Sequence, residues 1–283
     1  MVPFVKYSAN GNDFVVLDNR HQYWDPSETA LWAEVCDRHW GVGGDGVLFL
    51  ENSDKADYRM TYLNSDGREV SMCGNGARAL GDFALTFPEF RGKDKLSFET
   101  FAGSYSLKRN DQGAIELHMT ECQDVEKYDL ADFAQKIGAS FSYFIDTGVP
   151  HCLFELSELN MTREIPELMN FARQVRYDKR FPLGTNVNFV CEHGGELFMR
   201  TYERGVEDET QACGTGAVAV ARAWRSRGRD QDEWTLNTLG GQMRVRFEGD
   251  ETYFSGDVRA CFKGQFDPDV FRKSRSPRKK STP

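Results

Sequence analysis

Two cysteines with matching surroundings lie half a chain apart in this sequence of 283 residues. Each is followed by Gly-x-Gly-Ala, and a tyrosine and a glutamate precede each one at the same spacing. The two segments are Cys73-Gly74-Asn75-Gly76-Ala77 and Cys213-Gly214-Thr215-Gly216-Ala217. The pattern predicts a duplicated unit with one thiol in each copy. A pseudo-twofold arrangement would bring the thiols face to face, so that one removes a proton from a carbon and the other returns a proton to its opposite side.

The run after each cysteine is typical of a helix, which places each thiol at a helix N-terminus. Helix N-termini lower the pKa of a thiol, and the dipole contributes at most about 2 kcal/mol, or roughly one and a half pKa units. The neighbouring glycines allow a ligand close to the backbone, and the same N–H groups can bind a carboxylate. We therefore expect Cys73 and Cys213 to be reactive. The other cysteines are interpreted as small buried apolar residues: Cys36, Cys122, Cys152, Cys191 and Cys261.

Composition narrows the class of protein. The formal net charge of −9 argues against nucleic acid or an anionic membrane as a partner. No apolar run approaches the length of a membrane span, and the first residues lack the features of a secretory signal. An odd, scattered set of seven cysteines without C-x-x-C indicates neither a disulfide framework nor a zinc site. These features predict a cytoplasmic protein with no metal site.

Hydrophobic periodicity and turn residues predict the same order of elements in both halves. In the first half we expect strands on both sides of a turn at 8–13, a helix over 29–40, strands at 47–50 and 58–63, a helix from Cys73 to Phe87, and strands at 96–107 and 114–119. In the second half we expect strands at 142–145 and 152–156, a helix over 164–175, strands at 187–191 and 196–202, a helix over 217–226, and strands at 235–239, 242–247, 252–255 and 259–262. The polar, basic residues after Gln265 predict a disordered tail.

Eight ordered motifs between about Phe4 and Phe266 resemble the diaminopimelate epimerase family. Besides the two cysteine segments they are Gly11-Asn12-Asp13-Phe14, Arg38 to Gly46, Asn64-Ser65-Asp66-Gly67, Pro150-His151, Gly184 to Phe189, and Tyr202-Glu203-Arg204-Gly205. The resemblance implies an isomerase of lysine and peptidoglycan precursor biosynthesis. Such an enzyme interconverts LL- and meso-diaminopimelate with a catalytic cysteine pair, without pyridoxal phosphate or any other cofactor.

The resemblance also implies a fold of the mixed α+β class. Two pseudo-symmetric α/β domains are expected, each a curved mixed sheet or barrel wrapped around a central helix. We expect the first domain over residues 1–118, joined by a returning strand at about 259–266, and the second over 119–258. Residues 267–283 would form the basic tail.

The resemblance assigns roles to individual residues. Cys73 and Cys213 would be the acid/base pair. The implied substrate-binding residues are Asn12, Asn64, Gly74, Asn75, Asn186, Glu203, Arg204, Gly214 and Thr215, with His151, Thr147 and Gly46 in supporting positions. Among these, the residues at the two helix starts would hold the α-carboxylate. The partner would be a small molecule rather than nucleic acid or a membrane, and a homodimer is compatible with this interpretation.

Two positions depart from the family pattern. Val149 stands where many members have an asparagine, and Gly46 where some have a glutamine ligand. Thr147 or a backbone group would have to replace the missing asparagine. Three other interpretations stay open on the residues alone: an epimerase or racemase of another amino acid such as proline, hydroxyproline or histidine; a catalytically silent binding protein; and a thiol–disulfide oxidoreductase that uses Cys73 and Cys213.

Overall fold

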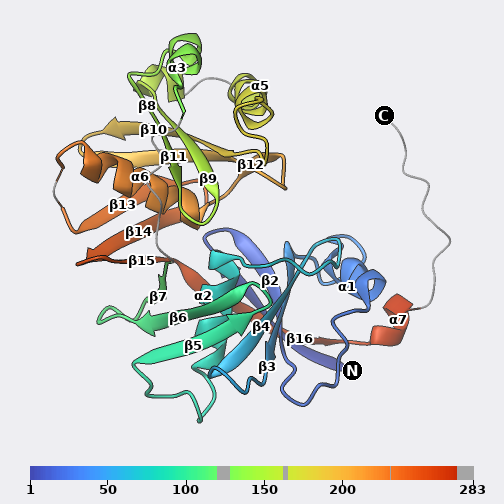
Figure 1. Ribbon diagram of the computed structural model, residues 1–283. Helices are drawn as coiled ribbons and strands as arrows, with labels where there is room; N and C mark the ends of the chain where they lie inside the picture. Colours follow the sequence, from blue (N-terminus) through green and yellow to red (C-terminus); the bar gives the residue numbers. More distant parts are fainter. Residues whose placement is uncertain (120–127, 162–164, 230, 273–283) are drawn as a thin grey trace, which may run out of the picture.

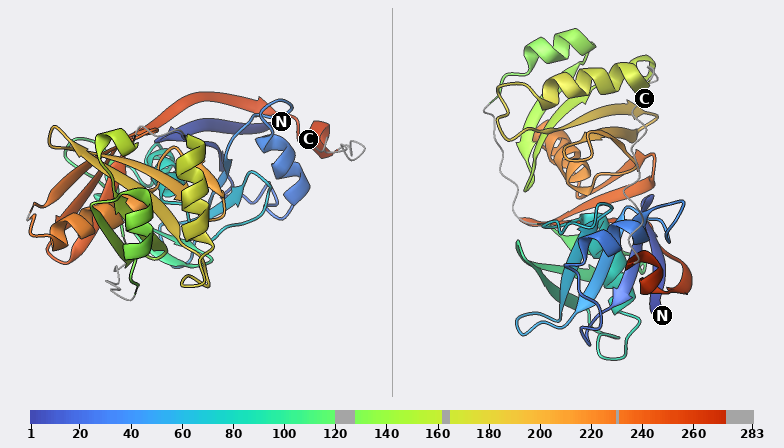
Figure 2. Two further views of the ribbon diagram at one scale, coloured as in Figure 1. Left: turned by 90° about the horizontal axis from the view of Figure 1, so that it is seen from above. Right: turned by 90° about the vertical axis from the view of Figure 1, so that its right-hand side faces the viewer.

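The computed structural model describes residues 1–119, 128–161, 165–229 and 231–272. Its strands form one continuous sheet that runs through two lobes (Figures 1 and 2), in the order β16-β1-β2-β3-β4-β5-β6-β7-β15-β14-β13-β11-β10-β9-β8, with β12 paired to β11. The mixed α+β class predicted from the sequence is confirmed. No helix in the described ranges is long and apolar enough to cross a membrane.

The first lobe surrounds helix α2 with strands. Strands β2 and β3 are parallel, as are β4 and β5, and the other neighbours within this lobe are antiparallel. The elements are β1 (Val2–Ala9), β2 (Asn12–Asp18), α1 (Thr29–Cys36), β3 (Gly46–Glu51), β4 (Tyr58–Asn64), α2 (Gly74–Ala84), β5 (Lys95–Thr100), β6 (Gly103–Arg109) and β7 (Ile115–His118).

The second lobe repeats this arrangement around α6. Its parallel pairs, β9 with β10 and β11 with β13, occupy the same places in the strand order. The elements are α3 (Ala131–Ile137), β8 (Phe141–Asp146), β9 (Pro150–Glu155), α4 (Glu158–Met161), α5 (Ile165–Arg176), β10 (Asn186–His193), β11 (Glu196–Glu203), β12 (Asp208–Thr210), α6 (Gly214–Ser226), β13 (Glu233–Thr238), β14 (Gly241–Glu248) and β15 (Glu251–Gly256). The duplication seen in the sequence is therefore a duplication of topology.

Two pairings join the lobes. Strand β15 pairs with β7 through Tyr253–His118 and Phe254–Leu117. The next strand, β16 (Val258–Phe266), pairs with β1 along its whole length and so returns the chain to the first lobe. Short helix α7 (Pro268–Arg272) follows and lies beside α1 (Figure 1).

The helices that begin at the two cysteine segments lie inside the lobes. Ala77, Ala79 and Leu80 of α2 have no exposed surface, and neither do Ala219 and Trp224 of α6. The small and apolar side chains of both helices are packed inside the surrounding strands. The prediction that α2 and α6 are the central helices is confirmed.

Several predicted boundaries were wrong. The helix predicted over 29–40 ends at Cys36, because Asp37 is extended and its carboxylate accepts the N–H groups of His39 and Trp40, a turn that competes with the helix. The strand predicted over 96–107 is the hairpin β5–β6, which turns where the Thr100 hydroxyl accepts the Ala102 N–H. Helix α2 ends at Ala84 rather than Phe87. Elements α3, α4 and β12 were not predicted.

The prediction of a disordered C-terminal tail was wrong for residues Pro268–Arg272, which form helix α7. Phe271 of α7 packs on Phe266, and the Arg272 guanidinium pairs with Glu28 at 2.7 Å, so these contacts order the chain as far as Arg272. The rest of the predicted tail, the predicted first residue Glu164 of α5, and Cys122 lie outside the described residues. Cys36, Cys152 and Cys191 are buried as predicted, but Cys261 is exposed because β16 is an edge strand whose outer face has no cover.

The buried tryptophan of α6 gives a test of the core. Replacing Trp224 by Ala should lower the free energy of unfolding by about 3–5 kcal/mol, because the cavity cannot close in a packed interior. Phe101→Ala, at a side chain that is 57% exposed, should change it by less than about 0.5 kcal/mol. Urea denaturation measures both. Equal effects of the two variants would contradict the central position of α6.

Candidate active site

Both cysteines occupy the residue immediately before a central helix. Cys73 is the N-cap of α2 and Cys213 the N-cap of α6, and both have extended backbone angles. The Cys73 Sγ accepts the Gly76 N–H at 3.4 Å. The Cys73 thiol therefore lies against an N–H group that the helix itself leaves unpaired, whereas the Cys213 side chain makes no capping hydrogen bond to α6.

One aromatic ring lies against both helix starts. A Cβ atom added to Gly74 would come within 2.8 Å of the Phe254 ring, and one added to Gly214 within 2.6 Å of the same ring. Real Cβ atoms do not approach so closely, so glycine is required at both positions. Phe254 lies on β15 where the two lobes join, and the tip of its ring contacts both cysteine segments.

Burial dominates the ionisation of the thiols. It raises the pKa of Cys73 to about 11 and that of Cys213 to about 12. The Glu203 carboxylate raises both further, while N–H groups at the helix starts lower them in part. The expectation that the helix N-terminus sets a low thiol pKa was therefore wrong, since desolvation outweighs the helix contribution. Burial also raises the pKa of Glu203 itself.

Polar side chains of the second lobe gather behind Cys213. The Thr215 hydroxyl lies 3.4 Å from the Cys213 Sγ, and His151 Nε2 lies 3.0 Å from that hydroxyl. Asn188 Nδ2 is 2.9 Å from His151 Nδ1. His151 is fully buried, and burial together with the Arg204 charge lowers its pKa to about 3. It is therefore neutral at physiological pH.

Asn75 joins the Cys73 side to the second lobe. Its Nδ2 donates to Asn12 Oδ1 at 2.9 Å and to the Ala212 carbonyl, next to Cys213, at 3.3 Å. The Asn12 Nδ2 in turn donates to Asp45 at 2.7 Å. The Arg78 guanidinium, fully buried, donates to Asn75 Oδ1 at 2.7 Å. The structure thus brings Asn12 and Asn75 together with both cysteine segments.

The remaining predicted ligands lie at the ends of neighbouring strands. Asn186 Oδ1 accepts the Arg204 N–H at 2.8 Å, and Asn186 Nδ2 lies 3.4 Å from His151 Nε2. Asn64 is exposed at the end of β4, where its Oδ1 accepts the Tyr62 hydroxyl at 2.9 Å. Burial raises the pKa of Tyr62, and the charges of Cys73 and Glu203 raise it further, which places that phenol on the Cys73 side of the site.

The two departures from the family pattern have a structural answer. A Cβ atom at Gly46 would lie 2.3 Å from the Leu63 carbonyl oxygen and 2.5 Å from the Tyr62 ring, so the strand pairing leaves no room for a side chain there. The Thr147 hydroxyl donates to the Thr215 carbonyl at 3.2 Å. Thr147 therefore holds the loop at Cys213, and backbone groups are better candidates to replace the missing asparagine.

Three residues of the site were not predicted. Asn188 lies two residues after Asn186 on the same strand face, so the alternation of β10 could have indicated it. Arg78 directly follows the first cysteine segment, one turn of α2 after Asn75. Phe254 carries no signal in the sequence, because its role depends on the pairing of β15 with β7.

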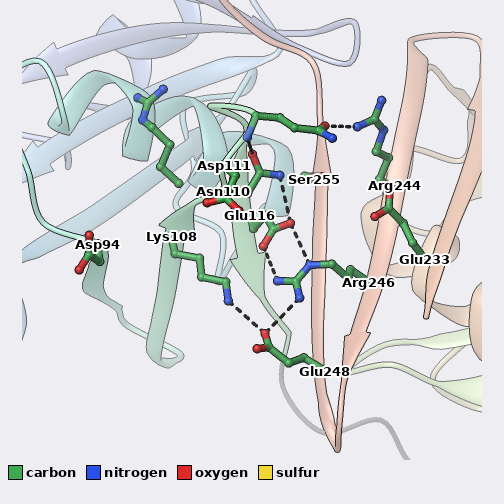
Figure 3. A pocket seen from close by; sticks show the side chains of 12 residues that line it. Asp94, Lys108, Asn110, Asp111, Glu116, Glu233, Arg244, Arg246, Glu248 and Ser255 are labelled. Atoms are coloured by element: carbon green, nitrogen blue, oxygen red, sulfur yellow. Dashed lines mark hydrogen bonds and ion pairs between the residues drawn. The ribbon is translucent and has the colours of Figure 1, made fainter.

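A charged pocket of about 540 Å³ lies on the other side of the β7–β15 seam (Figure 3). It is lined by Ser255, whose neighbour Phe254 faces the cysteine segments, so the pocket opens on the opposite sheet face. Its side chains pair across the seam: Arg246 with Glu116 at 2.7 Å, and Lys108 with Glu248 at 3.2 Å. We interpret it as a brace between the lobes.

Comparison with solved structures defines the fold class. The chain is similar to a PhzF-family phenazine biosynthesis protein of Bacillus anthracis, with a TM-score of 0.73 and 16% identity over 93% of this chain and 98% of that one. It is also similar to a probable proline racemase of Agrobacterium radiobacter, with a TM-score of 0.64 and 14% identity over 94% and 93%. These likenesses place the chain in the fold that those proteins share.

Sequence comparison identifies the family. The profile of diaminopimelate epimerase matches residues 4–125 and 143–260. The chain is 37% identical to a diaminopimelate epimerase of Methanocella arvoryzae, over 95% of this chain and 98% of that one. It is 36% identical to one of Flavobacterium psychrophilum, over 88% and 92%. The chain belongs to the diaminopimelate epimerase family.

The shared effect of Glu203 on the thiols is testable without substrate. Glu203→Gln removes a negative charge that raises both thiol pKa values, so more thiolate forms at any pH below those values. Alkylation of both Cys73 and Cys213 by iodoacetamide at pH 8–9 should become about threefold to tenfold faster, while Asp208→Asn, at an exposed carboxylate on β12, should change neither rate by more than about twofold. Peptide mapping by mass spectrometry measures each cysteine separately. A response at only one of them would contradict an effect of the Glu203 charge on both thiols.

Proposed function

We propose that this chain is a cofactor-independent epimerase that interconverts LL- and meso-diaminopimelate, in the biosynthesis of lysine and peptidoglycan precursors. The observation that carries the proposal is the pair of N-cap cysteines whose following glycines both contact the Phe254 ring, with the charge of Glu203 acting on both thiols. Membership of the diaminopimelate epimerase family supports the choice of substrate.

The reaction is a proton transfer at the substrate's α-carbon. One cysteine acts as thiolate: the α-carbon–hydrogen bond breaks and a sulfur–hydrogen bond forms on that face. The other cysteine acts as thiol and gives its proton to the opposite face, so the configuration inverts. The enzyme is then left with the two protonation states exchanged, ready for the reverse direction.

The helix starts are suited to hold the reacting end of the substrate. N–H groups at Gly74 and Asn75, and at Gly214 and Thr215, face the site with the positive ends of two helix dipoles behind them. A carboxylate bound there lies next to the α-carbon, and the same N–H groups stabilise the charge that develops when the proton leaves.

Substrate binding lowers the thiol pKa values, so that one of the two protonated thiols can ionise. Burial keeps the pKa values of both thiols high, and the Glu203 charge adds to this effect. A substrate ammonium placed beside Glu203 neutralises that carboxylate and adds a positive charge. A unit charge about 5 Å away at an effective dielectric constant of about 20 contributes about 3 kcal/mol, which is roughly two pKa units. Ionisation of one thiol is thus coupled to the arrival of the substrate.

The distal end of the substrate determines specificity in this proposal. Asn12, Asn64, Asn186 and Arg204 supply more polar groups than a substrate with a single amino-carboxylate end can satisfy. A site of this kind favours diaminopimelate over proline, the substrate named for one of the solved structures with a similar fold.

Three further parts of the proposal concern the whole molecule. Residues 1–118 with strand β16, and the segment 119–258, would act as two domains that close over the substrate and exclude water. The enzyme would work in the cytoplasm. It would form a homodimer through the free edge of β16, where Cys261 and Phe262 are exposed and an uncovered edge strand favours pairing.

Removing either thiol tests the two-base mechanism. Cys73→Ala and Cys213→Ala should each lower the rate of epimerisation of LL-diaminopimelate by at least about a thousandfold, without a change in folding. The double variant should cost little more than either single one, because the pair acts as a unit. Chiral chromatography of the product and circular dichroism of the protein measure these effects. Near-normal turnover in either single variant would refute the mechanism.

Substrate choice is tested by comparing amino acids that share the reacting end. A site built to bind a second amino-carboxylate end leaves buried polar groups unpaired when that end is missing, which costs ~10⁴- to 10⁵-fold in discrimination. We expect kcat/KM to be far higher for LL-diaminopimelate than for lysine, proline or histidine. A preference for any of the last three would overturn the substrate assignment and leave the cysteine chemistry standing.

A further inference from the structure

A chain of hydrogen bonds runs from the interior of the second lobe to Cys213. The Thr201 hydroxyl donates to Asn188 Oδ1 at 2.9 Å, and Asn188 Nδ2 lies 2.9 Å from His151 Nδ1. His151 Nε2 lies 3.0 Å from the Thr215 hydroxyl, which lies 3.4 Å from the Cys213 Sγ. Thr201, Asn188 and His151 are at most 2% exposed, so water does not compete for these contacts.

The donors and acceptors of this chain can be assigned in only one consistent way. The Thr201 hydroxyl donates to the amide oxygen of Asn188. Asn188 Nδ2 also lies 3.4 Å from the Cys152 carbonyl oxygen, a position that the amide oxygen would avoid because two acceptors repel each other. Asn188 Nδ2 can only donate, so His151 Nδ1 must accept. A neutral imidazole with an acceptor at Nδ1 carries its proton on Nε2. That proton goes to the Thr215 oxygen, which leaves the Thr215 hydroxyl hydrogen for the sulfur.

Among the described residues, one further contact to His151 Nε2 competes with this assignment, and it is weaker. Asn186 Nδ2 also approaches His151 Nε2, but at 3.4 Å, against 2.9 Å for Asn188 at Nδ1. The ring is fully buried and Arg204 faces it, so it stays neutral and can accept at one nitrogen only. The shorter bond therefore decides which nitrogen that is.

In the described part of the structure, no corresponding chain of hydrogen bonds leads to Cys73. The repeat places Leu48 of β3 where β10 has Asn188, since a Cβ atom on Gly76 would meet Leu48 at 3.1 Å and one on Gly216 would meet Asn188 at 2.6 Å. Asn75, the counterpart of Thr215, binds Asn12 and Arg78 instead. The duplicated unit thus keeps the cysteine in both copies but the polar chain in only one.

We propose that Asn188 is a positioning residue for proton transfer at Cys213: it fixes the Nε2–H tautomer of His151, so that the Thr215 hydroxyl donates to the sulfur and stabilises its thiolate. Glu203 and Cys73 also face this thiol and oppose its ionisation. Cys213 is only 4% exposed, so this hydroxyl replaces solvent as its hydrogen-bond donor. The relevance to catalysis rests on the proposed function, but the tautomer and the thiol can be measured without substrate.

Nitrogen-15 NMR of histidine-labelled enzyme tests the tautomer. In the full-length protein, His151 should be neutral, protonated at Nε2 and unprotonated at Nδ1 throughout pH 6–9, and a His151→Gln sample assigns its signals. Asn188→Leu, which introduces the residue of the other copy, should give a mixture of tautomers. An Nδ1–H tautomer in the wild type, or a variant with the wild-type spectrum, would overturn the proposal.

Alkylation by iodoacetamide tests the thiol, with Cys73 as an internal control. Asn188→Leu should slow alkylation of Cys213 about tenfold at every pH between 7 and 10, through the loss of one hydrogen bond to a charged group, and change that of Cys73 by less than about twofold. Thr201→Val removes only the far hydroxyl and should give a smaller effect of the same sign. It keeps the test available if Asn188→Leu does not fold. Equal slowing at both cysteines would show a structural effect and refute the proposal.

Steady-state kinetics of the same variants test whether this chain of hydrogen bonds affects turnover. Asn188→Leu should lower kcat for LL-diaminopimelate about tenfold and change KM by less than about twofold, because Asn188 does not touch the substrate. A raised KM with an unchanged kcat would contradict a positioning role. If the wild-type enzyme does not epimerise diaminopimelate, the proposed function fails, while the NMR and alkylation results still decide the role of Asn188.

Discussion

The contact of Gly74 and Gly214 with a single phenylalanine ring is the constraint on which the rest of the structure depends. Each glycine directly follows a cysteine and begins a central helix, and Phe254 leaves no space for a Cβ atom at either. The ring belongs to the strand that joins the lobes. The position of one thiol relative to the other is therefore fixed by one strand pairing and two missing side chains, and the ion pairs on the opposite sheet face brace that same seam (Figure 3).

A second constraint is the conflict between burial and ionisation. A cysteine that is to act as a base on a carbon acid must be kept from water, yet burial makes its thiolate costly. The helix starts offset part of this cost, and Glu203 adds to it until a cation arrives. The two copies differ in how they support the thiol: Cys213 has the chain through Thr215, His151 and Asn188, whereas Cys73 has N–H groups and the buried Arg78 charge nearby.

The sequence predicted those parts of the molecule that depend on local pattern. The repeat of Cys-Gly-x-Gly-Ala indicated the duplication, and the small apolar residues after it indicated that α2 and α6 are buried. The end of α1 was missed because the Asp37 carboxylate competes for backbone N–H groups, and the β5–β6 hairpin because its turn lacks a glycine at the centre. Phe254 could not be predicted, since its position depends on a pairing between distant strands. The thiol pKa values were misjudged because burial depends on the whole packed lobe.

The most direct test of the account is the early time course of the reaction in heavy water. With two bases on opposite faces, the proton removed from LL-diaminopimelate stays on one sulfur while a deuteron arrives from the other. Mass spectrometry of the separated isomers, before the reverse reaction sets in, should therefore find one deuterium in the meso product and none in the remaining LL substrate. Deuterium appearing in both isomers at similar rates, or product that keeps the original hydrogen, would contradict the placement of one catalytic thiol on each side of the carbon.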